Sequence, residues 1–184
     1  MTVPARERLQ QLVGDLAVVH GRVVLSSGAP ADYYVDLRRV TLHAQAAPLV
    51  GQVLLDLLDG AGLAPDAVGG LTMGADPVAA AVLHAAAARG RAVDAFVVRK
   101  EAKAHGLQRR IEGPDVAGRR VVAVEDTSTT GGSVMTAVEA LREAGADVVA
   151  VAVVLDRDTG ARERVEAAGL PYLAAYTKAD LGLA

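Results

Sequence analysis

The pattern of hydrophobic and polar positions along the chain has two periods. Apolar residues that recur every three to four positions predict amphipathic helices, the first of them over residues 4–19. Short apolar runs without this period, such as residues 121–124 and 148–155, predict buried strands. The same criteria predict further helices over residues 46–58, 76–88, 134–143 and 161–168, and further strands over residues 23–25, 33–37, 68–72, 92–98 and 170–175.

From residue 65 onward, the predicted strands and helices alternate along the chain. Strands that are apolar throughout suit a parallel sheet that helices cover on both faces. The sequence therefore predicts an α/β fold with a central, mostly parallel sheet, and a length of 184 residues fits a single domain. Residues 1 to about 45 are expected to form a small N-terminal lobe of that domain. In such sheets ligands bind at the carboxyl ends of the strands.

Composition and charge exclude several classes of protein. The chain has no cysteine, which excludes disulfides, thiolate metal sites and a cysteine nucleophile. A net charge of −3 argues against a bulk nucleic-acid binder. No stretch approaches the ~20 apolar residues of a membrane span, and the charged amino end lacks a signal-peptide profile. We therefore expect a cytoplasmic protein that binds neither nucleic acid nor membrane.

The most informative segment follows the strand predicted at residues 121–124. Two adjacent carboxylates, Glu125 and Asp126, precede a loop of hydroxyls and glycines that reaches a predicted helix at Ser133. A strand that leads through small residues into a helix binds phosphate, because free backbone N–H groups and the helix dipole converge there. The acidic pair would repel a phosphate but accept hydrogen bonds from sugar hydroxyls. The segment therefore predicts a phosphate site beside a diol site, as a ribose 5-phosphate requires.

An ordinary structural interpretation of this loop also exists. Hydroxyls and glycines between a strand and a helix are common in turns and helix caps. The acidic pair favours the functional interpretation, because adjacent like charges cost energy and usually serve a purpose.

Residues 99–117, here called the lid segment, suit neither a packed helix nor a strand. A structureless stretch of this length inside a compact domain is typical of a lid or of disorder. The alternatives are a solvated surface hairpin with scattered charge and a mobile cationic lid beside the phosphate loop. The second explains better why an acidic chain collects its cationic groups here, and such a lid would exclude water from a bound polyanion. These groups are Arg99, Lys100, Lys103, His105, Arg109 and Arg110.

Three motifs, taken together, resemble one known family. They are residues 25–38 with Ser27-Gly28 and the run from Tyr33 to Arg38, residues 99–106 (Arg-Lys-Glu-Ala-Lys-Ala-His-Gly), and residues 125–133. In order and spacing they resemble the orotate phosphoribosyltransferases of the type I phosphoribosyltransferase family, in the actinobacterial form. The lid motif separates this family from the purine-salvage enzymes that share the loop for phosphoribosyl diphosphate (PRPP).

The resemblance implies a type I phosphoribosyltransferase fold and a Mg²⁺-dependent transfer of the phosphoribosyl group from PRPP to N1 of orotate, in pyrimidine biosynthesis. It implies that Glu125 and Asp126 bind the ribose hydroxyls directly or through Mg²⁺, which is otherwise held mainly by PRPP. The residues implied to hold the 5-phosphate are Thr127, Ser128, Thr129, Thr130, Gly131, Gly132 and Ser133.

The resemblance also implies a homodimer with shared active sites. Arg99, Lys103 and His105 would reach the diphosphate of PRPP in the neighbouring subunit, while Lys100 would serve its own site. Together with Asp126, the first three are the implied catalytic residues. Thr129, Tyr34 and Arg157 would contact orotate, with Arg157 pairing its carboxylate, as suits a planar guanidinium. Without the resemblance, a surface salt bridge from Arg157 to Asp156 or Asp158 is an equal alternative.

The sequence departs from the enterobacterial pattern at two positions. Ser26 and Gly74 stand where lysines are common, so two cationic contacts to PRPP are missing. Residues 72–74 are still expected to form the diphosphate turn of the family, often with a cis peptide. Two rival functions remain, a PRPP-sensing regulator without activity and a phosphoribosyltransferase for another base. The complete lid motif argues against the first, and Arg157 argues against the second, since a purine has no carboxylate.

Overall fold

The computed structural model describes residues 3–24, 30–101 and 110–183. Its central element is a six-stranded sheet in the order β5-β4-β3-β6-β7-β8. The strands are β3 (Ala67–Leu71), β4 (Asp94–Val98), β5 (Ile111–Glu112), β6 (Arg120–Ser128), β7 (Asp147–Asp156) and β8 (Tyr172–Thr177). All neighbouring pairs are parallel except β4 and β5. This confirms the predicted α/β fold with a mostly parallel sheet.

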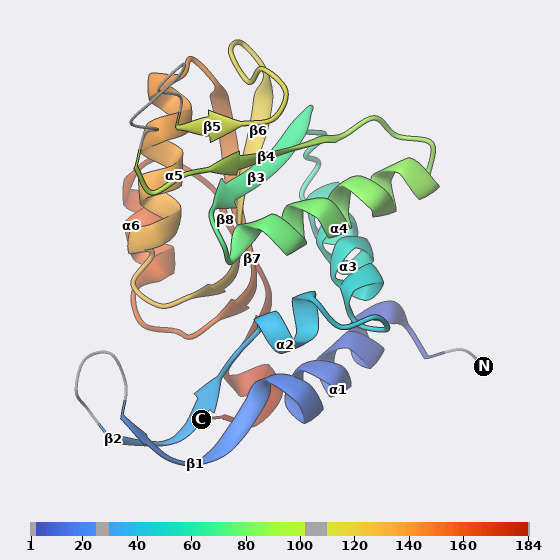
Figure 1. Cartoon of the computed structure of the whole chain (residues 1–184), viewed down its shortest axis with the longest axis vertical. Coiled ribbons are helices and arrows are strands. Elements are labelled where there is room, and N and C mark those ends of the chain that lie inside the picture. The colour runs from blue at the N-terminus through green and yellow to red at the C-terminus, as the bar shows by residue number, and fades with distance from the viewer. Residues whose placement is uncertain (1–2, 25–29, 102–109, 184) are drawn as a thin grey trace.

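Helices cover both faces of this sheet, as Figure 1 shows. The helices α3 (Ala47–Gly60) and α4 (Ala75–Ala88) pack on one face, and α5 (Gly132–Glu143) and α6 (Ala161–Ala167) pack on the other. Alternate residues of β6 enter opposite cores: Val122 and Val124 face α3 and α4, while Val121 and Ala123 face α5. A strand buried on both sides is apolar at every position, which is the pattern that its sequence shows.

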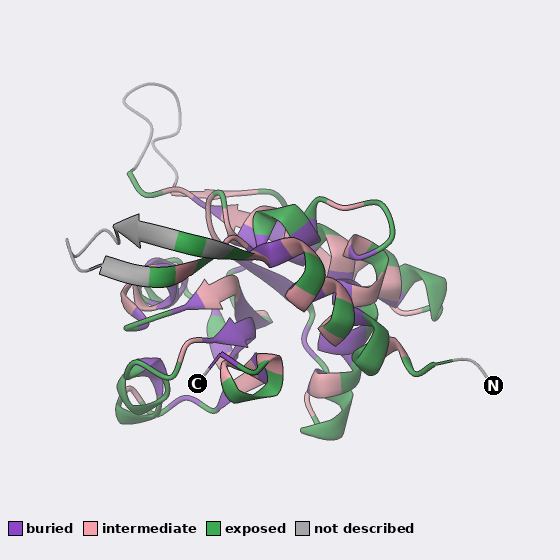
Figure 2. Ribbon diagram, turned by 90° about the horizontal axis from the view of Figure 1, so that it is seen from below, coloured by how far each residue is buried: buried purple, intermediate pink, exposed green. Residues whose placement is uncertain are grey.

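The amino-terminal residues pack onto the first of these cores. They form α1 (Ala5–Ala17), an antiparallel pair β1 (Val18–Val24) and β2 (Pro30–Val35), and the short helix α2 (Arg38–Thr41). The inner face of α1 joins the same buried cluster as α3 and α4 through Leu9, Val13 and Ala17. A one-turn 3-10 helix, η1 (Ala179–Leu181), follows β8. Figure 2 shows the buried residues on the sheet and on the inward faces of the helices.

Four details differ from the sequence prediction. Strand β1 begins at Val18, whereas a helix was expected to residue 19, and α2 was not predicted. Strand β5 lies inside the lid segment, where no strand was expected; it gains its hydrogen bonds only by pairing with β4. Strand β6 continues to Ser128, because β7 pairs with it as far as Asp156, so the acidic pair lies within the strand. No helix of the described residues is long and apolar enough to cross a membrane.

The strand order creates a crevice between β3 and β6. The chain adds β4 on one side of β3 and β7 on the far side of β6, so the connections diverge at this point. The paired register runs from Ala67 with Val121 to Gly69 with Ala123, and both strands continue beyond it. In open α/β sheets, ligands bind outside the carboxyl ends of the strands where the order reverses. The fold therefore places a site at the ends of β3 and β6.

Candidate active site

A pocket of about 360 Å³ opens at the carboxyl ends of β3, β6 and β7. Its lining comes from β2 and the start of α2, from the end of β3 and the turn after it, and from Lys100 in the lid segment. The end of β6, the β6–α5 loop, the first turn of α5 and Arg157 after β7 complete it. The pocket therefore joins segments that lie far apart in the sequence. The predicted site residues that it brings together are Tyr34, Lys100, Glu125, Asp126, Thr127, Thr129, Ser133 and Arg157.

The acidic pair lies in the last part of β6, half-buried in the pocket wall. The pKa of Glu125 is raised to about 7, first by burial and then by the negative charge of the neighbouring Asp126, while a hydrogen bond with the Ser133 hydroxyl partly offsets the rise. Burial also raises the pKa of Asp126. The hydrogen bond that its Oδ1 accepts from the Thr127 N–H at 2.7 Å acts in the opposite direction and partly offsets this rise. Two carboxylates held this close favour a ligand that donates hydrogen bonds or brings positive charge.

The raised pKa of Glu125 predicts a pH-dependent cost of keeping this side chain in the folded protein. Because the folded pKa of about 7 exceeds the ordinary value of 4.5, the folded state binds the proton more tightly. The contribution of this tighter proton binding to the free energy of unfolding is fully present below pH 4.5 and is lost as the pH rises through 7. Glutamine does not titrate. The unfolding free energy of Glu125→Gln relative to that of wild type should therefore be about 2–3 kcal/mol higher at pH 8 than at pH 5. Urea unfolding at both pH values measures this gain.

A matched control for this prediction is Glu163→Gln, which changes an exposed glutamate of α6. Its effect on unfolding free energy should be the same at pH 5 and pH 8. If Glu125→Gln also shifts stability equally at the two pH values, the carboxylate of Glu125 is not held at a raised pKa.

The loop after β6 leads directly into α5. Gly131 adopts a left-handed conformation (φ 72°), and α5 begins at the next residue without a side-chain cap. The first N–H groups of α5 therefore lack a capping side chain and are oriented as a phosphate site requires. Ser128 is 1% exposed and does not line the pocket, so its implied contact with the 5-phosphate stays a prediction. Thr130, Gly131 and Gly132 lie in the loop but do not line the pocket either.

The turn after β3 forms the opposite wall. The Thr72–Met73 peptide bond is cis, which confirms the conformation expected at residues 72–74. The Thr72 hydroxyl donates to Asp76 Oδ2 at 2.8 Å and ties the turn to the start of α4. A Cβ atom added at Gly74 would lie 2.6 Å from Asp126 Oδ1. Glycine therefore lets the turn approach the acidic pair closely, and any larger residue here would require the Asp126 carboxylate to shift.

Arg157 follows β7 and lines the pocket. Its backbone N–H donates to the Ser128 carbonyl oxygen at 3.0 Å. Its guanidinium forms no ion pair with any described residue, although both Asp156 and Asp158 are adjacent in the chain. The alternative of a surface salt bridge is therefore not observed. An unpaired guanidinium in a pocket suits an anionic group of a ligand.

Two charged residues of this pocket were missed by the sequence analysis. Arg38 Nε donates to Asp36 Oδ1 at 2.8 Å, and this hydrogen bond holds the pKa of the Asp36 carboxyl below its ordinary value. The positive charge of Arg38 also partly offsets the rise that burial causes in the pKa of Asp126. The available signal was the motif from Tyr33 to Arg38, which pointed to the family without showing which of its side chains would reach the acidic pair.

The lid segment is only partly described. Lys103 and His105 lie outside the described residues, as does Ser26. Arg99 does not line the pocket. Its guanidinium lies 3.7 Å from the Glu112 carboxylate, and its backbone N–H donates to the Arg110 carbonyl oxygen at 2.7 Å. The roles implied for these residues remain predictions.

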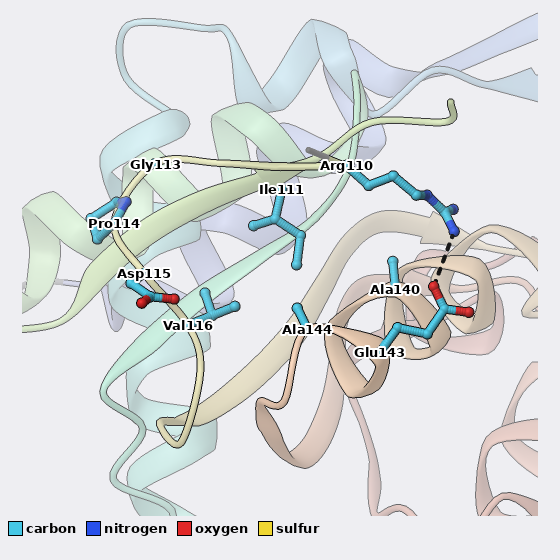
Figure 3. Close-up of a pocket in the computed structure, with 9 residues that line it drawn as sticks. All are labelled: Arg110, Ile111, Gly113, Pro114, Asp115, Val116, Ala140, Glu143 and Ala144. Atoms are coloured by element: carbon cyan, nitrogen blue, oxygen red, sulfur yellow. Dashed lines mark ion pairs between the residues drawn. The ribbon is translucent and has the colours of Figure 1, made fainter. Parts of the chain in front are cut away.

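A second cavity of about 410 Å³ lies between the β5 region and the carboxyl half of α5 (Figure 3). Arg110 crosses its mouth to Glu143, and an ion pair of 3.8 Å joins the two side chains. This cavity shares no lining residue with the pocket at the strand ends. Its residues, together with the β4–β5 pairing, anchor the carboxyl end of the lid segment to the body of the protein.

Residues 40–168 match the family model of the phosphoribosyl transferase domain. The fold and the family match together define the class of the protein as a phosphoribosyltransferase.

Two curated relatives are similar over nearly the whole chain. Orotate phosphoribosyltransferase of Streptomyces coelicolor is 72% identical over 179 residues, which cover 97% of each protein. That of Corynebacterium glutamicum (strain R) is 60% identical and covers 100% of this chain and 97% of its own length. A crystal structure of Mycobacterium tuberculosis H37Rv orotate phosphoribosyltransferase in complex with PRPP has a TM-score of 0.85 and 52% identity, covering 98% of this chain and 100% of that chain. The chain belongs to the orotate phosphoribosyltransferase family.

Proposed function

We propose that the chain transfers the 5-phosphoribosyl group of PRPP to N1 of orotate, giving orotidine 5'-monophosphate and diphosphate in pyrimidine biosynthesis in the cytoplasm. The observation that carries this proposal is the pocket at the strand ends. It presents the acidic pair, the uncapped start of α5 and the Arg157 guanidinium to one cavity. The names of the relatives, and the binding of PRPP by the Mycobacterium tuberculosis protein, support the same reaction.

The β6–α5 loop would hold the ribose 5-phosphate of PRPP. Glu125 and Asp126 accept hydrogen bonds from the two ribose hydroxyls. The loop from Thr127 to Ser133 supplies the phosphate with backbone N–H donors and with the hydroxyls of Thr127, Thr129 and Ser133, which line the pocket. Because the pocket also contains the turn after β3, the diphosphate lies against Thr72, Met73 and Gly74. This arrangement fixes C1 of the ribose between the diphosphate and the base.

Orotate would lie between Tyr34, Thr129 and Arg157, which line the same pocket. Arg157 binds its carboxylate in a bidentate pair, and that contact distinguishes orotate from uracil and from purines. The C1–N1 bond forms as the C1–O bond to diphosphate breaks, the electron pair leaves with the diphosphate, and the proton of N1 passes to water. This chain contributes mainly by positioning the two reactants and by neutralising the leaving diphosphate.

Mg²⁺ fits the donor set of the pocket. Glu125 and Asp126 provide hard oxygen ligands, although no cluster of three or more candidate ligand side chains occurs in the described ranges. A metal held here would take most of its ligands from PRPP and water, as is usual for Mg²⁺ in phosphoryl sites. When bound, it would neutralise charge on the diphosphate.

The lid segment would complete the site across a homodimer. Arg99, Lys103 and His105 would act on the PRPP of the neighbouring subunit, and Lys100, which lines the pocket, on its own. Arg99 must then exchange Glu112 for the diphosphate. An apolar groove of about 590 Å³ between α3 and α4 supports a second copy as partner. The groove includes Leu42, whose side chain is 72% exposed, and lies next to the site through α2.

The reaction is tested by mixing purified protein with PRPP, Mg²⁺ and one base at a time, and by measuring diphosphate release. We expect release with orotate and little with uracil, adenine or hypoxanthine. Folded protein that releases no diphosphate with orotate contradicts the proposal. If it binds PRPP but turns over no base, the protein is a PRPP sensor, and if it prefers a purine, the role of Arg157 is wrong.

A further inference from the structure

Asp156 is a buried ionisable residue to which the proposed reaction assigns no role. It ends β7, directly before Arg157, and its side chain is 3% exposed. It forms no ion pair with any described residue. A buried carboxylate without a cation is costly unless hydrogen bonds satisfy it, so the fold must gain something from its presence.

The contacts of Asp156 define the turn that carries Arg157. Asp156 Oδ1 accepts a hydrogen bond from the Asp158 N–H at 3.0 Å. Asp158 has a positive φ of 52°, a conformation that residues other than glycine adopt at a cost. On the other side, the Arg157 N–H donates to the Ser128 carbonyl oxygen of β6. The backbone of Arg157 is thus held by β6 before the turn and by the Asp156 carboxylate after it.

Two buried hydroxyl groups lie close to this carboxylate. Ser128 is 1% exposed and Tyr172 is 4% exposed, and neither hydroxyl has a hydrogen-bond partner of ordinary geometry among the described residues. Burial raises the pKa of the Tyr172 phenol, and the negative charge of Asp156 raises it further. A phenol O–H can donate to a carboxylate, so the nearby Tyr172 is a second group that could stabilise the buried Asp156 side chain.

We propose that Asp156 is a positioning residue for recognition of the base: by holding the 156–158 turn, it directs the Arg157 guanidinium into the pocket. This inference rests on the proposed function, in which Arg157 binds the carboxylate of orotate. Asp156 touches neither substrate and acts through Arg157. Its loss should therefore affect orotate and leave the PRPP site, built by β6 and α5, unchanged.

Steady-state kinetics of three variants test this role. Asp156→Ala removes the acceptor and is expected to raise the KM for orotate about tenfold while the KM for PRPP stays within about twofold of wild type. Asp156→Asn keeps an oxygen in the same place and should restore most of the orotate affinity. Asp156→Ser, which keeps a weaker acceptor, should give an intermediate KM and serves as the test if the alanine variant does not fold.

A double-mutant cycle separates positioning from general damage. If Asp156 acts only through Arg157, then Asp156→Ala should change the KM for orotate far less in an Arg157→Ala background than in wild type. The matched control is Asp180→Ala. The Asp180 carboxylate closes a similar turn after β8 by accepting the Thr177 N–H at 2.7 Å, outside the pocket. This control should leave both KM values unchanged.

The outcomes distinguish this role from the proposed function. Wild-type protein without orotate-dependent diphosphate release overturns the proposed function and the role of Asp156 with it. If the wild type is active, three results would overturn the positioning role alone. Asp156→Ala could keep the wild-type KM for orotate, it could raise the KM values for orotate and PRPP equally, or it could have the same effect in the Arg157→Ala background as in wild type.

Discussion

Mixing two inactive variants, Lys103→Ala and Asp126→Asn, is expected to restore activity. Each variant alone should lose about 10²–10³-fold in kcat, because one loses a cation at the diphosphate and the other an acceptor for the ribose. If the lid of one subunit serves the site of the other, a heterodimer has one site with both lesions and one site with neither. In a random one-to-one mixture about half of the dimers are heterodimers, so about a quarter of all sites should recover.

The measurement is diphosphate release after subunit exchange, with exchange confirmed independently by tagged subunits. Lids that act within their own chain would leave every site with one lesion, and mixing would restore nothing. Lys103→Ala should also bind orotate nearly as wild type does, because the lid serves the diphosphate. An equal loss of orotate affinity would contradict that role.

Gly74→Ala is expected to lower kcat/KM for PRPP about 10²-fold, although it adds only one methyl group. The new Cβ would lie 2.6 Å from Asp126 Oδ1, so Asp126 must shift, which disturbs the hydrogen bond that this oxygen accepts from the Thr127 N–H. Gly74 has φ −62° and ψ −42°, so alanine suits its backbone and the contact with Asp126 alone causes the loss. Initial rates at varied PRPP concentration measure the effect.

The control for this prediction is Gly14→Ala. Gly14 lies in α1, and a Cβ added there meets nothing within 4 Å. The substitution should leave the kinetics unchanged and raise the unfolding free energy by about 1 kcal/mol, since alanine favours helix over glycine. If Gly74→Ala also retains full activity, the close approach of the turn to Asp126 has no functional importance.

Local chemistry explains why much of the fold was predictable. Strands buried on both faces must be apolar at each position, so β6 and β7 were recognisable as unbroken apolar runs. Short elements carry no such signal. Strand β5 has two residues and exists because β4 offers hydrogen bonds to it, and α2 has four residues that pack against α1 and α3. The length of β6 was likewise determined by its neighbour β7.

The sequence by itself determined the class of chemistry. The acidic pair with its small-residue loop is one unbroken stretch of the chain and the lid motif is another, so each can be recognised without a fold. Only the tertiary structure decided which groups meet. Glu125 and Arg157 line one pocket because the carboxyl ends of the parallel strands β6 and β7 lie at the same edge of the sheet, and Tyr34 joins them from β2, which is not part of that sheet. The same packing sets Gly74 against Asp126 and buries Asp156 behind Arg157, since contacts across strands depend on register, which no local pattern records.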